Sequence, residues 1–222
     1  MKLRSTAIVF AFPLTLALTL GACSSSSDSA ATDPATEAVV DESAGSETIP
    51  ADIVAADTIA ADAEFNANDV TFAQGMIPHH QQAVQMSTIA LDPERKAGAK
   101  VKDLATRIQG AQDPEIQLMT GWLTEWGQPI DAMTGMEGME TGDMPGMEGM
   151  MSSDEMTVLA AANGPAFDKL WLDMMVRHHQ GAVTMSKTAQ TDGKAAVVKE
   201  LAGKIISAQE AEIAEMSKLL AG

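Results

Sequence analysis

The stretch MIPHHQQAVQMS, from Met76 to Ser87, returns 99 positions later as MVRHHQGAVTMS, from Met175 to Ser186. Each copy places a Met three residues before a His pair and a second Met seven residues after the first His. The chain has four His in total, and all four lie in these two copies. The repeat is therefore the main indication of both fold and function.

The repeat extends well beyond the His pairs. Residues 69–72 align with residues 168–171, residues 105–116 align with residues 202–213, and Met119 matches Met216. Apolar residues in these segments recur at spacings of three and four, as they do on one face of a helix. Two amphipathic helix pairs related by repetition predict an all-α, ferritin-like four-helix bundle.

Capping residues and apolar spacing predict where the helices begin and end. Asn68 or Asp69 is expected to cap the first helix, and Asp92 is expected to cap the second. The four long helices are predicted at about residues 69–90, 93–126, 164–190 and 193–220. A capping box at Ser152 predicts a short additional helix through Leu159. Pro78 and Pro114 lie inside predicted helices and are expected to kink or interrupt them.

The N-terminus has the pattern of an export signal. Lys2 and Arg4 precede an apolar run that ends in small residues, and Leu20-Gly21-Ala22-Cys23 resembles the lipobox of bacterial lipoproteins. We therefore predict a signal peptide over residues 1–22 and a lipid anchor at Cys23, facing the periplasm or the cell exterior. An ordinary signal peptide or an uncleaved anchor are the alternatives.

Composition limits what the mature chain can bind. The formal charge is −17, and removal of Lys2 and Arg4 with the signal gives −17 − 2 = −19. Such a charge argues against nucleic acid as a partner. Residues 23–65 are rich in Ser, Ala, Thr and acidic residues and predict a flexible tether before a domain at residues 66–222. Because Cys23 is the single Cys, a metal site must use His, Met or carboxylates.

The repeated motif supplies such a donor set when it is placed on a helix. At 100° per residue, Met76, His79 and Met86 share one stripe, with His80 on its shoulder. The second copy repeats this stripe, and Met174 extends it. The predicted metal ligands are Met76, His79, His80, Met86, Met174, Met175, His178, His179 and Met185. Possible further ligands, or hydrogen-bond partners of the His, are Gln112, Glu115, Met119, Gln209, Glu212 and Met216.

The donor chemistry favours a soft ion. Bundles that hold two iron or manganese ions carry Glu three residues before the His, where this chain carries Met76 and Met175. Thioether and imidazole donors favour Cu(I), accept Ag(I) as a mimic and tolerate Cu(II). Glu115 and Glu212 keep open a di-metal oxidase acting on Cu(I) or Fe(II). A metal-free structural or stress-response lipoprotein, in which these carboxylates only hydrogen-bond the His, is the remaining alternative.

A Met-rich segment separates the two halves. Residues 128–152 are rich in Met, Gly and Glu, and eight Met lie between Met133 and Met156. So much Gly disfavours a helix, and a Met run without a core to fill is unusual. The segment predicts a copper-capturing loop. A linker with a chance Met bias, or a sink for oxidants, would give the same composition.

Together, the doubled Met-x-x-His-His motif and the following Ala-Gln-x-x-Glu-Ile-x-x-Met pattern resemble the domain-of-unknown-function 305 family. The resemblance spans about residues 69–220. It implies an exported ferritin-like bundle of the kind that includes CopM-type periplasmic copper-binding proteins. In the second copy Met174 precedes Met175, whereas Gly75 precedes Met76 in the first, so the first site is expected to be weaker. We expect a lipid-anchored protein that buffers copper without catalysis; any partner that receives the ion is not indicated by the sequence.

Overall fold

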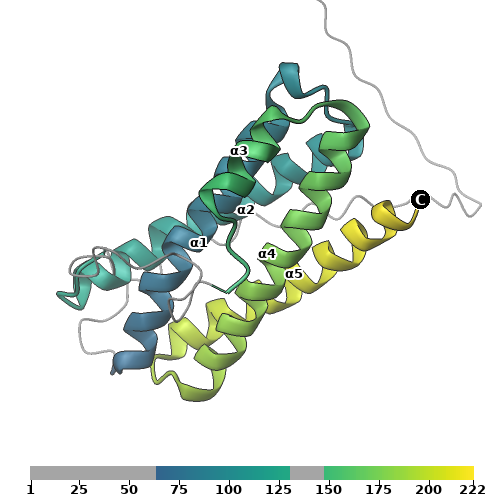
Figure 1. Cartoon of the computed structure of the whole chain (residues 1–222). Helices are drawn as coiled ribbons and strands as arrows, with labels where there is room; N and C mark the ends of the chain where they lie inside the picture. The colour runs from purple at the N-terminus through teal and green to yellow at the C-terminus, as the bar shows by residue number, and fades with distance from the viewer. Residues whose placement is uncertain (1–63, 131–147) are drawn as a thin grey trace, which may run out of the picture. The chain divides into compact units, whose positions relative to one another are not determined.

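The computed structural model describes residues 64–130 and 148–222, and every regular element within them is helical (Figure 1). In chain order they are α1 (Ala67–Leu91), the 3-10 turn η2 (Pro93–Arg95), α2 (Ala99–Glu125), α3 (Ser153–Ala161), α4 (Gly164–Asp192) and α5 (Ala196–Ala221). The predicted all-α architecture is confirmed. The predicted signal peptide, Cys23 and nearly all of the tether lie outside the described residues, as do residues 131–147 of the Met-rich segment.

Two helix hairpins make up the fold. α1 packs against α2, α4 packs against α5, and the hairpins meet along α1 and α4 (Figure 1). The indole N–H of Trp171 donates a buried hydrogen bond of 3.0 Å to the carbonyl of Met86. Seven residues away on each helix, the rings of His79 and His178 are in contact. Because residue 86 meets 171 and residue 79 meets 178, α1 and α4 run antiparallel, with the two motifs at one level.

The buried side chains form two apolar clusters that follow the repeat. One contains Met76 of α1, Met119 of α2 and Met185 of α4, which we call thioether cluster A. The other contains Met86 of α1, Met175 of α4 and Met216 of α5, which we call thioether cluster B. Trp122 belongs to the first apolar cluster and Trp171 to the second. The histidines therefore lie between two Met-containing halves of the core.

Some helix ends differ from those predicted. The cap of α1 is Asn66, not Asn68 or Asp69, because the Asn66 side chain accepts from the backbone N–H groups of residues 68 and 69. Asp92 caps only η2, and α2 begins at Ala99. α1 and α2 continue through Pro78 and Pro114 without interruption. The predicted capping box at Ser152 is confirmed as the start of α3.

Two aspartates, the buried Asp69 and the partly buried Asp168, tie each hairpin to the other. Asp69 of α1 accepts hydrogen bonds of 3.0 and 3.1 Å from the backbone N–H groups of Lys194 and Ala195, at the start of α5. Its counterpart Asp168 of α4 accepts from the N–H of Gly98, at the start of α2. Neither α2 nor α5 has a side-chain cap of its own. Each hairpin therefore orders the beginning of the other hairpin's second helix.

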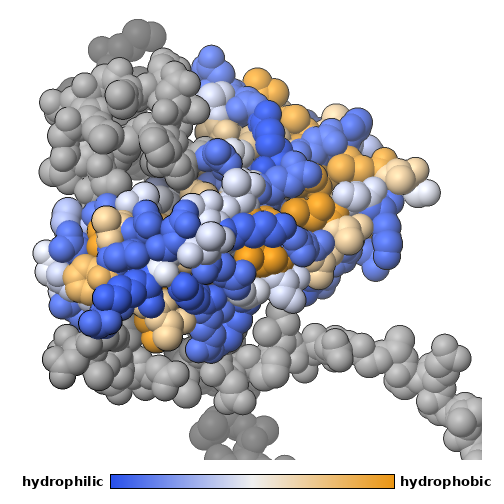
Figure 2. Space-filling model, turned by 90° about the horizontal axis from the view of Figure 1, so that it is seen from below, coloured by the Kyte–Doolittle hydropathy of each residue, from blue (hydrophilic) through white to orange (hydrophobic). Residues whose placement is uncertain are grey.

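The surface is mixed in polarity. In the view of Figure 2, hydrophilic residues predominate and apolar residues form small patches between them. Within residues 64–130 and 148–222, no helix is both long and apolar enough to span a bilayer.

We predict that Asp69→Ala lowers the free energy of unfolding by about 3 kcal/mol, because it leaves buried backbone N–H groups without an acceptor. Asp103→Ala is the control, since this side chain is 65% exposed. Its change is expected to stay within about 0.5 kcal/mol. Urea unfolding measures both. Equal losses for the two variants would contradict the role assigned to Asp69.

Candidate metal centre

All four histidines lie in one fully buried layer where α1 crosses α4. Each is 0% exposed. The ring centroids of His79 and His178 are 3.8 Å apart, with an interplanar angle of 41°. His80 and His179 follow directly on the same helices. The two motifs thus meet in one place rather than forming distant sites.

Three of the four imidazoles are held through Nε2. His80 Nε2 lies 2.8 Å from a carboxylate oxygen of Glu115, and His179 Nε2 lies 2.7 Å from one of Glu212. His79 Nε2 lies 3.0 Å from the backbone carbonyl oxygen of Glu148. A carbonyl or an ionised carboxylate can only accept, so each Nε2 carries the hydrogen and donates it. Glu115 and Glu212 therefore orient His80 and His179 from α2 and α5.

The opposite ring nitrogen of every histidine is buried and has no hydrogen-bond partner among the described residues. This holds for Nδ1 of all four rings and also for Nε2 of His178. Buried polar atoms are nearly always paired, and each unpaired one needs an explanation. Metal-binding histidines commonly donate one ring N–H to a carboxylate or carbonyl and offer the other nitrogen to the ion. The layer has this arrangement on three rings.

Burial keeps the central pair uncharged. The pKa of His79 is lowered from 6.5 to about 3, mainly by burial and then by the neighbouring His80, and the hydrogen bond to Glu148 opposes this only in part. The pKa of His178 is also held well below 6.5, first by burial and then by His79. At neutral pH both rings are therefore neutral, and each offers one ring nitrogen with a lone pair that could coordinate an ion.

Thioethers lie on both sides of this layer. Along α1, cluster A precedes His79 by one turn and cluster B follows it by two. Five of these six Met are 0% exposed, and Met185 is 9% exposed. Met174 belongs to the apolar cluster around cluster B, but it also lines a surface groove between α3 and α4. The structure thus gathers the predicted Met around the histidines, with Met174 nearest the outside.

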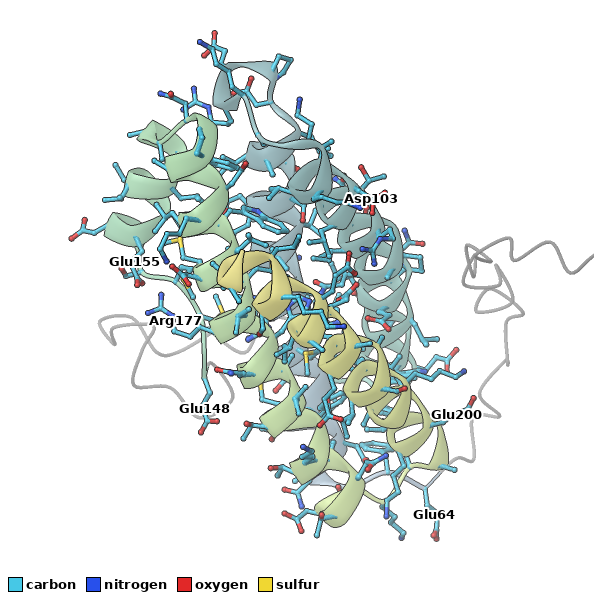
Figure 3. The ribbon with its side chains drawn as sticks, turned by 90° about the vertical axis from the view of Figure 1, so that its right-hand side faces the viewer. Glu64, Asp103, Glu148, Glu155, Arg177 and Glu200 are labelled. Atoms are coloured by element: carbon cyan, nitrogen blue, oxygen red, sulfur yellow. The ribbon has the colours of Figure 1, made fainter. Side chains whose placement is uncertain are left out.

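A strap formed by residues 148–151 crosses the histidine layer. Its Glu148 carbonyl meets His79, while the Glu148 side chain points away from the helices (Figure 3). A Cβ on Gly181 would lie 1.7 Å from that carbonyl oxygen, so only glycine lets the strap approach α4. At the matching position of α1, Gln82 bonds both the N–H and the C=O of Met151, at 2.7 and 2.8 Å.

The strap was not predicted, although the sequence contains a sign of it. The two motif copies read HHQQAV and HHQGAV, and their first difference after the His pair is Gln82 against Gly181. Gln82 holds the strap by hydrogen bonds, and Gly181 leaves room for it. Sequence reasoning also missed Ser87 and Ser186, whose hydroxyl oxygens are buried and unpaired, as are the Oε1 atoms of Gln112 and Gln209. The unpaired oxygens therefore occupy equivalent positions in the two halves of the repeat, as the Nδ1 atoms of the histidines do.

Hard-cation geometry is not present in the described part of the chain. There, no group of three or more His, Cys, Asp or Glu side chains is placed to hold a metal ion. Glu115 and Glu212 lie beyond the rings that they orient, on the Nε2 side. Any ion held between the helices would therefore need the thioethers to complete its coordination.

Comparison with known proteins assigns the family. Residues 69–220 match the domain of unknown function 305, DUF305. This chain is a DUF305 protein. The family predicted from the doubled motif is thereby confirmed, over the range expected. The comparison with curated proteins finds no match.

Solved DUF305 structures share the fold. A protein from Streptomyces coelicolor, assigned as secreted, is 36% identical, with 73% of this chain and 94% of that chain aligned and a TM-score of 0.61. A DUF305 fragment from Deinococcus radiodurans is 30% identical, with coverages of 70% and 97% and a TM-score of 0.59. CopM in its Cu(II)-bound form is 32% identical, with coverages of 69% and 95% and a TM-score of 0.58. CopM has also been solved with Cu(I) and with Ag.

We predict that the DUF305 domain loses stability as pH falls below about 6.5. The unfolded chain binds a proton at His79 near pH 6.5, whereas the folded chain binds it only near pH 3. Between these values the unfolded state holds more protons, so stability falls with falling pH by up to about 1.4 kcal/mol per pH unit for this residue.

Urea unfolding between pH 5 and 8 measures this dependence, with His79→Gln as the comparison. The variant should show a shallower slope below pH 6.5 and the same slope above it. Identical slopes for the two proteins would mean that His79 is not held neutral in the fold.

Proposed function

We propose that this DUF305 protein binds copper, preferentially as Cu(I), at the histidine layer between its two hairpins. The observation that carries the proposal is the set of buried Nδ1 atoms without partners, three of them on rings fixed through Nε2. Copper-bound CopM, a structural relative, supports the choice of ion. The nine predicted ligands of the two motifs and Met119 and Met216 are the candidate donors.

The donors favour Cu(I) over harder ions. Thioethers and neutral imidazoles suit a soft monovalent ion and supply no anionic oxygen to a hard one. A buried positive charge is costly unless it is compensated. Glu115 and Glu212 offer that compensation through His80 and His179, each from within 2.8 Å of the ring. Ag(I) should occupy the same site, and imidazole would also accept Cu(II).

Access to the layer involves the strap. An ion that used Nδ1 of His79 would leave the bond to Glu148 in place, whereas one that used Nε2 would have to displace that carbonyl. The first route requires less rearrangement. We therefore propose Nδ1 as the coordinating atom of His79, with the strap fixing the ring from the other side.

We further propose that the protein acts outside the cytoplasm as a copper-buffering lipoprotein. The lipobox-like sequence ending at Cys23 and the acidic tether over residues 23–65 support a membrane-anchored chain. The Met-rich segment at residues 128–152 would capture copper near the strap. Neutral Met donors suit an oxidising compartment, because they form no disulfides and need no deprotonation.

We predict that replacing all four His with Ala removes tight Cu(I) binding in competition with a Cu(I) chelator. Circular dichroism reports whether this variant stays helical. Because buried replacements can destabilise the fold, Glu115→Gln is a milder test. It removes the charge that orients His80 and should weaken binding about 10- to 100-fold.

Glu210→Gln is the matched control for Glu115→Gln. Glu210 lies on α5 in an exposed pair with Lys187, at 52% exposure, and should leave the affinity unchanged. Copper uptake by the four-His variant equal to that of the wild type would eliminate the histidine layer as the site.

We also predict that the copper-loaded protein does not turn over. A buffering protein should show no sustained oxygen consumption with Cu(I) or Fe(II), because the described carboxylates are not arranged as a di-metal centre. An oxygen electrode measures this, with free Cu(I) at the same concentration as the blank. Continued consumption above that blank would identify an oxidase instead.

A further inference from the structure

A groove on the outside of the bundle is lined by three methionines that the histidine layer does not use. It lies between α1 and α3, measures about 470 Å³, and includes Met150, Met151 and Met156 in its walls. Gln82 and Gln85 of α1 contribute amide groups on the opposite side. Among the described residues that line the groove, none is charged. The groove therefore offers soft, neutral donors and no hard oxygen anion.

Packing accounts for Met151 and in part for Met156, which lies against the core, but it leaves Met150 and Met156 partly exposed. Leu159 is the fully buried residue of α3, whereas Met150 and Met156 are only partly buried. Met is a flexible gap-filler that serves best inside a core, and a half-exposed position gains little from it. Met151 is 2% exposed and joins the core beside the groove. Two of the three methionines that line the groove are thus partly exposed, and the third is buried beside it.

The three residues are held in place before any ion binds. Gln82 fixes the backbone of Met151 through two hydrogen bonds. One residue later, the Ser152 capping box fixes the first turn of α3, which carries Met156. The Sδ of Met151 accepts a 2.7 Å hydrogen bond from Arg177, whose charge is paired with Glu155 (Figure 3). Met150 and Met156 therefore have the freer sulfur atoms, whereas the Met151 sulfur is already paired with a guanidinium.

We propose that Met150 and Met156, held beside the buried Met151, form an outer binding site for a soft monovalent cation such as Cu(I) or Ag(I). This deepens the proposed copper-binding function and rests on it. Thioethers select such ions over Mg²⁺, Ca²⁺ or Zn²⁺, which prefer oxygen or nitrogen donors. Glu148, whose carbonyl meets His79, lies two residues before Met150. The outer site is therefore two residues along the chain from the carbonyl that contacts the inner layer.

The test is an Ag(I) titration of the full chain carrying ¹³C-labelled methionine methyl groups, followed by NMR. Met→Leu variants assign each signal, and Leu preserves apolar volume. The signals of Met150 and Met156 should shift within the first few equivalents of Ag(I). They should shift equally in His178→Gln, which removes an inner donor and leaves the hydrogen bond between His79 and the strap in place. The double variant Met150→Leu/Met156→Leu should bind one Ag(I) ion fewer, whereas Val158→Leu, an exposed residue on the same helix, should bind the full number.

The titration separates the outer site from the inner one. Shifts of Met76 and Met175 without shifts of Met150 and Met156 would overturn the outer site and keep the histidine layer. Shifts of the outer pair alone would support this inference while removing the inner layer from the proposed function. An unchanged number of bound ions in the double Leu variant would also overturn the outer site.

Discussion

The antiparallel crossing of α1 and α4 is the contact on which the rest of the structure depends. It brings the His79 and His178 rings to 3.8 Å in a core that excludes water. Imidazole loses hydration there, and the pKa of each ring falls because the charged form is disfavoured. The same crossing places one thioether cluster on each side of the layer. Donor identity, charge state and burial of the site all follow from one helix contact.

The outer helices and the strap complete this arrangement by constraining ring orientation. Glu115 and Glu212 take equivalent positions on α2 and α5, as the repeat requires. The central pair breaks that symmetry, because His79 meets the strap while both ring nitrogens of His178 stay without a partner. The two motif copies therefore differ chemically despite their similar sequences. His178 has the greater freedom to adapt to an incoming ion.

Periodicity sufficed to predict the helices, the repeat and the burial of the His and Met residues. A stripe on one helix indicates a buried face, but the sequence left open whether the two stripes meet in one layer or form two separate sites. The ends of the helices were harder to predict. Asp69 was expected to cap α1, but in the folded protein its carboxylate also accepts hydrogen bonds from the backbone N–H groups of Lys194 and Ala195. Local rules cannot anticipate an acceptor supplied from 125 residues away.

The strap was unpredictable for the same reason, since it depends on what lies opposite Gln82 and Gly181 after folding. A comparison of the two copies does locate the difference, but not its cause. Neither periodicity nor composition indicates which backbone carbonyl a histidine will meet. The burial of the predicted ligand residues could thus be anticipated, while the orientation of each ring had to come from the structure.

The exchanged aspartates also bear on the origin of the fold. A lone hairpin would carry a carboxylate without hydrogen-bond donors. The first backbone N–H groups of its second helix would have no acceptor. Both deficits are removed when two such hairpins pack together. Here Asp69 and Asp168 each accept a hydrogen bond from the start of a helix in the other hairpin. A duplicated chain of this kind behaves as a covalently joined dimer. An ancestor of half the length would have met the same needs by pairing with its own copy.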